Sequence, residues 1–301
     1  MSVNKRVLLT FIMYPVSCAR YLAWGFQAAG CEVVTAGPTT GNFIPWGKNG
    51  LWLDHKWDWR PDVPLDHRMP HEIGDVLAVT GPVNLVVQTD AHFALMGDAP
   101  VPNVCFAVDN HVRDYTLRRW DLIFGAHSWA KRSDEAHFRW LPCAYDPRWH
   151  RELGRERTVD AAFVGVFYDR RWQVVNKLFE NGVSLALAQG KVYDESNEVY
   201  NAARVALCPS FSGDLACRVF EGMAAGCAVV ADRCADMDRI GMVEGEHYLA
   251  FSWDEPDSLV EAVSLACEPE RWRRVTAAAK AWVAGHIWAA RAEAILREVG
   301  L

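Results

Sequence analysis

The strongest constraint on the fold is an alternation of short apolar runs with amphipathic stretches. A strand-like run at Val7–Ile12 is followed by a helical pattern over Ser17–Ala29 and then by the β-branched run CEVVTAG. Strand, helix and strand in this order predict a β-α-β unit. Further strands are expected at Leu85–Gln88, Val101–Val108, Leu122–Gly125 and Phe138–Leu141. The first half of the chain is therefore predicted to form a parallel sheet with helices on both faces.

A second alternation follows the polar, poorly periodic stretch Pro142–Arg157, which is typical of a linker. It begins with the strand-like DAAFVGVF, ends with the strand-like YLAFS, and is followed by three long helical patterns up to Val299. Two such halves predict an α/β protein with two Rossmann-like domains. Proteins of this class bind their ligands beyond the carboxyl ends of the strands.

Composition excludes several classes of protein. The chain has 301 residues, 51% of them hydrophobic, and lacks the run of about 18 apolar residues that a membrane span needs. Its N-terminal apolar segment is rich in β-formers, so we interpret it as a first strand and not as a signal peptide. The nine cysteines contain no CxxC pair, which disfavours a zinc site and favours reduced thiols in a cytoplasmic protein.

Charge is unevenly distributed along the chain. The net charge is −7, yet Asn110–Val175 holds 12 Lys and Arg against 9 Asp and Glu. A mildly basic segment in an acidic protein favours a small anionic ligand. It argues against broad nonspecific binding of nucleic acid and leaves a local basic groove open.

The stretch FVGVFYDRR is the first candidate for a phosphate site. Gly165 follows a strand, and Arg170 and Arg171 begin the next helix. Glycine lets a ligand approach the backbone, helix N-terminal amides face it, and arginine binds phosphate in a bidentate manner. The alternative is a pair of solvated arginines.

The stretch CPSFSGDLACRVFEG supplies a second strand-end loop, with Ser210 at its start and Arg218 and Glu221 at its end. We expect a helix from Val219 to Ala225 that stops at Gly226, with Glu221 in its first turn. Arg218 could bind a phosphate and Glu221 both hydroxyls of a ribose. The alternative is a helix-capping acid paired with Arg218. Neither GxGxxG nor GxxxxGK[ST] occurs, which disfavours NAD enzymes and P-loop kinases.

The first half offers candidate bases and aromatic contacts. Asp109 and His111 follow the strand in PNVCFAVDNH, and Asp90 follows another, so each could serve as a base or a hydrogen-bonding group. A loop rich in tryptophan includes Trp52 and Trp57, whose rings could stack on an acceptor sugar or base. The alternative is that these rings fill a small core under the loop.

In combination, these motifs resemble the GT-B superfamily of glycosyltransferases, and specifically its spore-maturation CgeB-like group. The second half carries most of the resemblance, and two strings extend it into the first half. The matching strings are DAAFVGVFYDRR, YNAARVALCPS, RVFEGMAAGCAVVAD, EGEHYLAFSWDEPDSLVEAV and HIWAARAEAIL, with PNVCFAVDNH and WLPCAYDP before them.

The resemblance implies two facing Rossmann-like domains with an interdomain cleft. Residues 1–150 would form the acceptor domain, 151–284 the nucleotide-sugar donor domain, and 285–301 a helix that packs back on the first domain. Glu221 would bind the ribose, and Arg170 or Arg171 the diphosphate. The donor site would also include Gly165, Ser210, Arg218, Val219 and Phe220.

The resemblance also implies a reaction without a cofactor or an essential metal, and we find no DxD motif beside the arginine-rich loop. Many retaining members carry a second glutamate eight residues before the one that corresponds to Glu221, where this chain has Gly213 beside Asp214. An inverting reaction would need a base, for which Asp109 and His111 are the candidates. A retaining reaction would use the leaving diphosphate, with His111 as a sugar contact.

The sequence thus predicts a cytoplasmic glycosyltransferase that moves a sugar from a nucleoside diphosphate to a hydroxyl group. The acceptor could be a small molecule, a glycan, a protein or DNA that carries a hydroxymethylated base. Trp52, Trp57 and Asp90 are its candidate contacts. A second alternative is a nonenzymatic module that binds a nucleotide sugar.

Overall fold

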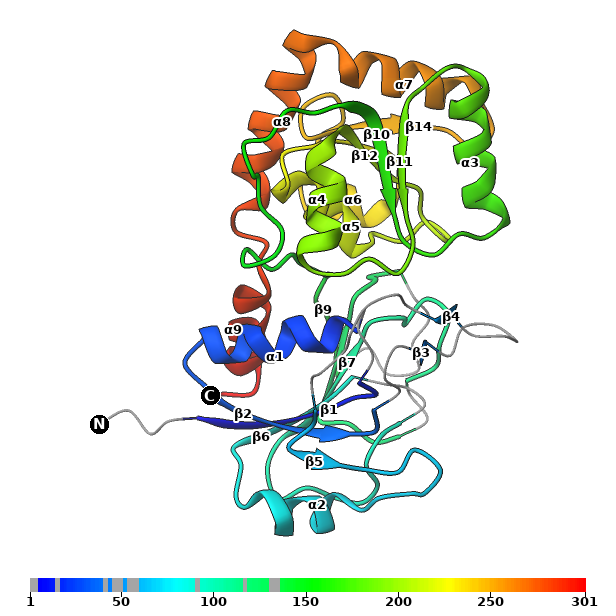
Figure 1. Ribbon diagram of the computed structural model, residues 1–301. Coiled ribbons are helices and arrows are strands. Elements are labelled where there is room, and N and C mark those ends of the chain that lie inside the picture. The colour runs from blue at the N-terminus through cyan, green and yellow to red at the C-terminus, as the bar shows by residue number, and fades with distance from the viewer. Residues whose placement is uncertain are drawn as a thin grey trace. The chain divides into compact units, whose positions relative to one another are not determined.

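The computed structural model of the protein describes residues 5–13, 17–39, 43–44, 51–52, 60–89, 93–115, 118–129 and 136–301. The chain divides into two compact units (Figure 1). Unit 1 contains Met1–Pro142 and Trp288–Leu301, and unit 2 contains Cys143–Ile287. Within the described part of the chain, no helix is both long and apolar enough to cross a membrane.

Unit 1 is built on a seven-stranded parallel sheet with the order β5-β2-β1-β6-β7-β8-β9. Its central strands are buried along their whole length, as expected for a parallel sheet covered on both faces. The strands are β1 (Arg6–Thr10), β2 (Glu32–Gly37), β5 (Val63–Pro64), β6 (Leu85–Gln88), β7 (Asn103–Ala107), β8 (Leu122–Gly125) and β9 (Phe138–Trp140). A separate antiparallel pair joins β3 (Phe43–Ile44) to β4 (Leu51–Trp52).

The helices of unit 1 are α1 (Cys18–Ala28), α2 (Ile73–Thr80) and α9 (Trp288–Glu298). The C-terminal α9, red in Figure 1, packs against α1, in blue. The ring of Tyr21 stacks on Trp288 with 6.4 Å between centroids. A Cβ at Gly25 would lie 2.5 Å from the Trp288 carbonyl oxygen, so glycine is what lets the two helices approach this closely.

Unit 2 is built on a five-stranded parallel sheet with the order β11-β10-β12-β13-β14. The strands are β10 (Val159–Val164), β11 (Leu185–Ala188), β12 (Ala203–Cys208), β13 (Ala228–Asp232) and β14 (Tyr248–Phe251). The helices are α3 (Asp169–Glu180), α4 (Asp194–Ala202), α5 (Cys217–Ala224), α6 (Ala235–Arg239), α7 (Asp257–Cys267) and α8 (Pro269–Val283).

Alternate residues of this sheet face opposite layers of helices. Phe163, Leu207 and Val230 belong to one core cluster together with side chains of α3, α7 and α8. The next residues along the strands point the other way, and there α5 lies directly on β12. A Cβ at Gly222 would lie 2.5 Å from the Cβ of Ala206. This close approach fixes the position of α5, the helix that carries Arg218 and Glu221.

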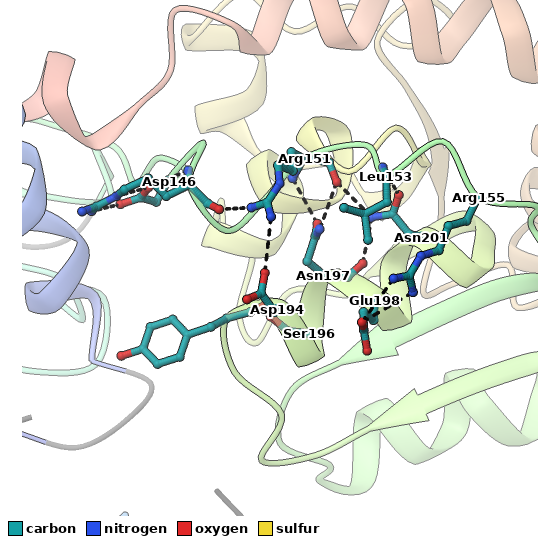
Figure 2. Close-up of polar contacts among 11 residues, drawn as sticks. Asp146, Arg151, Leu153, Arg155, Asp194, Ser196, Asn197, Glu198 and Asn201 are labelled. Atoms are coloured by element: carbon teal, nitrogen blue, oxygen red, sulfur yellow. Dashed lines mark hydrogen bonds and ion pairs between the residues drawn. The ribbon is translucent and has the colours of Figure 1, made fainter. Parts of the chain in front are cut away.

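The stretch expected to be a linker belongs largely to unit 2, because α4 holds it. The side-chain oxygen of Asn197 accepts a hydrogen bond from the Arg151 amide at 3.1 Å, and that of Asn201 accepts one from the Leu153 amide at 2.7 Å. Both side-chain amides donate to the Arg151 carbonyl at 3.0 Å. We call Asn197 and Asn201 the asparagine pair; Figure 2 shows them between α4 and the incoming chain.

The predicted α/β class and both parallel sheets are confirmed. The predicted start of α5 was less accurate, because the helix begins at Cys217 and not at Val219. The prediction that Glu221 lies in the first turn is therefore wrong, and Glu221 lies in the second. The physical reason is that the N-cap residue, Ala216, makes no capping hydrogen bond with its side chain and so gives no signal in the sequence. The Gly226 stop is confirmed, with φ +78° at the residue after the C-cap, Ala225.

We expect Gly222→Ala to lower the free energy of unfolding by about 1–3 kcal/mol, because the added methyl group overpacks the contact between α5 and β12. Urea denaturation measures the change. Gly74→Ala is the matched control: this glycine lies in α2, and a Cβ there meets nothing within 4 Å. The control should be neutral or stabilising by up to about 1 kcal/mol. Equal effects of the two substitutions would contradict the packing argument.

Candidate functional site

The sheet of unit 2 has its topological switch point between β10 and β12. From β10 the chain passes to β11 on one side and then crosses to β12 on the other. Ligands of open parallel sheets bind beyond the carboxyl ends of the strands at such a point. Gly165 directly follows β10, and Ser210 lies two residues after β12. The two loops singled out in the sequence therefore flank the switch point.

Two arginines, Arg171 of α3 and Arg218 of α5, converge on this point, and we call them the arginine pair. The guanidinium carbon of each lies 5.3 Å from the ring centroid of Phe163. Arg171 Nη1 donates to the Val166 carbonyl at 2.9 Å, and Arg218 Nη1 donates to the Pro209 carbonyl at 3.4 Å. Each guanidinium is thus held at the end of one of the two strands that border the switch point.

The arginine pair brings two positive charges close together. Among the described residues, neither guanidinium forms an ion pair within 4.0 Å, and the charge of Asp214 acts on Arg171 only from a greater distance. The buried Nε of each arginine has no hydrogen-bond partner. Burial, and then the charge of Arg218, lower the pKa of Arg171 to about 9. Two neighbouring cations with unused donors form a site that favours a ligand with more than one negative charge.

Gly165 is required for this arrangement. Its φ is +150°, and a Cβ there would lie 3.0 Å from Arg218 Nη2 and 3.2 Å from Phe163 Cζ. Any larger residue would push against the guanidinium group. The glycine therefore lets Arg218 reach the end of β10.

Tyr168 adds a neutral donor beside the arginine pair. Its ring lies 4.2 Å from the guanidinium carbon of Arg171, and its hydroxyl group is buried without a hydrogen-bond partner. Burial raises the pKa of Tyr168, so the phenol keeps its proton at neutral pH. The O–H can therefore donate to an anion bound by Arg171.

Arg170 lies in a different environment from Arg171. Its guanidinium carbon lies 4.0 Å from the ring centroid of Trp253, in the loop after β14. Of the two arginines in FVGVFYDRR, Arg171 is the one that joins Arg218. A contact of Arg170 with a diphosphate stays a prediction.

The hydroxyl of Ser210 organises its own loop. It donates to Asp232 Oδ2 at 2.5 Å and accepts from the Gly213 amide at 2.9 Å. The carboxylate of Asp214 likewise accepts from the amides of Phe211 and Ser212, at 2.6 and 2.9 Å. Both side chains shape the loop that leads into α5, and a contact of Ser210 with a ligand stays a prediction.

On α5, Val219 and Phe220 are buried, and the ring of Phe220 stacks on Trp282 with 6.0 Å between centroids. Their side chains fix the helix, so any contact with a ligand would have to use their backbone. Glu221 differs, since 18% of its side chain is exposed.

The carboxylate of Glu221 lies beside the imidazole of His150. Its Oε1 lies 3.6 Å from Nε2 of His150. Burial lowers the pKa of His150 to about 4, so the imidazole is neutral at pH 7 and the contact is not an ion pair. The buried hydroxyl of Tyr200 has no hydrogen-bond partner, and burial, followed by the charge of Glu221, raises the pKa of this phenol.

In unit 1, Asp109 and His111 lie in the turn that follows β7. Asp109 is exposed, and its carbonyl accepts from the Val112 amide at 2.9 Å. The ring of His111 lies edge-on to His127, with 4.3 Å between centroids. Asn110 bonds to both backbone groups of His127, at 2.8 and 3.0 Å, and so joins the ends of β7 and β8. The structure thus places a second histidine, His127, against the predicted His111.

The remaining predicted acceptor residues are not tested. Trp52 lies in β4, but its side chain is outside the described residues, as are Trp57 and Asp90. A contact of these residues with an acceptor stays a prediction.

One DxD string does occur, at Asp236 and Asp238 in α6. Asp236 is fully buried, and the carboxylate of Asp238 accepts from Arg233 at 3.1 Å. The string therefore does not present two free carboxylates to a metal ion.

Three residues of these sites were missed in the sequence. Tyr168 lies within the quoted stretch FVGVFYDRR and could have been included as a donor beside the arginines. His127 follows its strand in GAHSW, the same signal that selected His111. His150 gave no signal, because it lies in the stretch interpreted as a linker.

Comparison with known proteins extends these observations. The chain is similar to an alpha-glucosyltransferase in complex with UDP and a 13-mer DNA, with TM-score 0.69, 11% identity and coverage of 99% of this chain and 100% of that one. It is also similar to Anabaena HepE in complex with UDP and glucose, with TM-score 0.67, 8% identity and coverage of 99% of this chain and 100% of that one. Sucrose-phosphate synthase from Thermosynechococcus elongatus gives TM-score 0.63, 13% identity and coverage of 98% of both chains.

This likeness over the whole chain shows that the fold is GT-B. The sequence profile of the glycosyl transferase-like family matches residues 147–297, and the chain belongs to that family. It is therefore a glycosyltransferase, as the sequence predicted. A search of curated protein sequences found no match.

The buried His150 predicts a dependence of stability on pH. The pKa of this imidazole falls from its ordinary 6.5 to about 4 in the folded protein. Between pH 6.5 and about 4, the unfolded chain therefore binds a proton at this histidine and the folded chain does not. Stability consequently decreases as the pH falls through this range. One such proton contributes about 1.4 kcal/mol per pH unit. Urea unfolding at several pH values gives the free energy of unfolding as a function of pH. Between pH 4 and 6.5 this free energy should change less steeply with pH in His150→Gln than in wild type. Equal slopes for the two proteins would contradict the assignment.

Proposed function

We propose that this glycosyltransferase takes its sugar from a nucleoside diphosphate sugar bound by unit 2 and transfers it to a hydroxyl group. The observation that carries the proposal is the arginine pair at the switch point between β10 and β12, with buried Nε donors that have no partner. A diphosphate offers the charge and the acceptor oxygens that these buried donors lack.

The residues around the arginine pair would share the work of binding. Arg171 and Arg218 would bind the diphosphate and stabilise the negative charge that grows on it as the sugar leaves. Tyr168 would donate to the same oxygens. Glu221 would accept hydrogen bonds from the ribose hydroxyls. Because guanidinium groups would do the electrostatic work, we propose that no metal ion or cofactor is needed.

In the reaction, the acceptor oxygen forms a bond to the anomeric carbon while the bond from that carbon to the phosphate oxygen breaks. The acceptor proton must move to a base. For an inverting reaction we propose Asp109 as this base, with His111 as an orienting group. For a retaining reaction the proton would move to the departing diphosphate, and His111 would contact the sugar.

For the donor we propose uridine diphosphate with a hexose. The alpha-glucosyltransferase and HepE were both solved with UDP, the latter also with glucose, which supports this choice. We further propose that the chain belongs to the CgeB-like group and acts in the cytoplasm. The second proposal is supported by the nine cysteines, all of them within the described residues and none in a disulfide.

The acceptor is a small molecule, a glycan or a protein in our proposal, with hydroxymethylated DNA as a second candidate. Two observations favour DNA: the basic segment Asn110–Val175, and the DNA complex of the similar alpha-glucosyltransferase. The net charge of −7 opposes it. Transfer of labelled sugar to hydroxymethylated and to unmodified DNA distinguishes the candidates.

The proposed reaction should proceed without metal. We expect release of UDP from a UDP-hexose in the presence of an acceptor, at a rate that excess EDTA leaves nearly unchanged, because arginines neutralise the leaving group. A coupled UDP assay measures the rate. Binding of UDP-sugars without any turnover would support a nonenzymatic module. Complete loss of activity in EDTA that magnesium or manganese restores would refute metal independence.

A further inference from the structure

A short turn before the core of unit 2 holds the imidazole of His150. The Asp146 carbonyl accepts from the amides of Trp149 and His150, at 3.1 and 2.8 Å. The Asp146 carboxylate accepts from the Arg148 amide at 3.0 Å and also binds the Arg148 guanidinium. Asp146 therefore closes the turn with both its backbone carbonyl and its carboxylate.

The same turn fixes which nitrogen of His150 carries the proton. The Asp146 amide donates to Nδ1 at 3.3 Å, so Nδ1 is an acceptor. In a neutral imidazole the proton then lies on Nε2. Nε2 is the atom that lies 3.6 Å from Glu221 Oε1. An N–H group consequently points toward the carboxylate.

The residue after His150 is fixed as well. The asparagine pair binds both backbone groups of Arg151, and Arg151 also lies 3.6 Å from Asp194 at the start of α4 (Figure 2). His150 is therefore held by the turn before it and by α4 after it. Only 1% of its side chain is exposed, so solvent does not compete for its N–H.

We propose that His150 is a positioning residue, whose Nε2–H biases the Glu221 carboxylate toward the orientation that receives the ribose hydroxyls of a nucleotide. This inference rests on the proposed function and deepens it. Free glutamate side chains rotate about three bonds, and ordering them on binding costs affinity. A fixed donor beside Oε1 removes part of that cost before the ligand arrives.

The chemistry of the contact suits this task. A protonated imidazole would form an ion pair with Glu221 and compete with the ribose, whereas burial keeps the pKa of His150 at about 4 and the ring neutral. A separation of 3.6 Å exceeds that of a full hydrogen bond. The contact therefore biases the orientation of the carboxylate and does not bind it as tightly as a full hydrogen bond would.

The test compares UDP with 2′-deoxy-UDP, because only the former has the 2′-hydroxyl. Calorimetry gives both dissociation constants for each variant. Wild type should prefer UDP about tenfold, the equivalent of one charge-assisted hydrogen bond. Glu221→Ala should reduce the preference to below about twofold.

The His150 variants separate positioning from packing. His150→Phe keeps a ring of similar size without the N–H, and we expect its preference to fall to about threefold or less. His150→Gln keeps an N–H at similar reach and should recover most of the preference. The control is Val263→Ala in the core on α7, which should lower stability and leave the preference unchanged.

The outcomes separate the two claims. If wild type discriminates between the nucleotides and His150→Phe discriminates equally well, the inference is overturned and the proposed function stands. If His150→Gln loses as much preference as His150→Phe, the N–H is not the active group, which also overturns it. If wild type binds neither nucleotide, the proposed function fails and the inference fails with it.

Discussion

The repulsion between Arg171 and Arg218 is the constraint on which the site in unit 2 depends. Two guanidinium groups lie against one phenylalanine ring with unused donors and no carboxylate in contact among the described residues. Such an arrangement costs stability in the free protein. It persists because the strand ends and the helices α3 and α5 hold it, and a bound diphosphate would relieve it.

The fold of unit 2 supplies the necessary rigidity from several directions. Gly222 lets α5 lie directly on β12, and Gly165 lets Arg218 reach the end of β10. The asparagine pair fixes the chain before β10 on α4, which in turn fixes His150 beside Glu221. The groups assigned to diphosphate and ribose are thus positioned by separate parts of one core.

The sequence predicted the parallel sheets and the glycine that ends α5, because buried strands and glycine stops leave local patterns. The sequence could not tell which of the two neighbours, Arg170 or Arg171, joins Arg218 at the strand ends. Successive residues on a helix point about 100° apart, so that choice needs the orientation of α3. The role of His150 was also beyond reach, since its contact with Glu221 joins segments far apart in the chain. The side-chain bonds of Asn197 and Asn201 that hold this stretch leave no local pattern.

The most direct test of the account is the affinity of UDP for single arginine variants. Calorimetry should show that Arg171→Met and Arg218→Met each weaken UDP binding by at least about tenfold, since each removes charge-assisted bonds to the diphosphate. Arg170→Met, the neighbouring arginine that stacks on Trp253, should have a smaller effect. Wild-type affinity in both Arg171→Met and Arg218→Met would contradict the claim that the arginine pair is the diphosphate site.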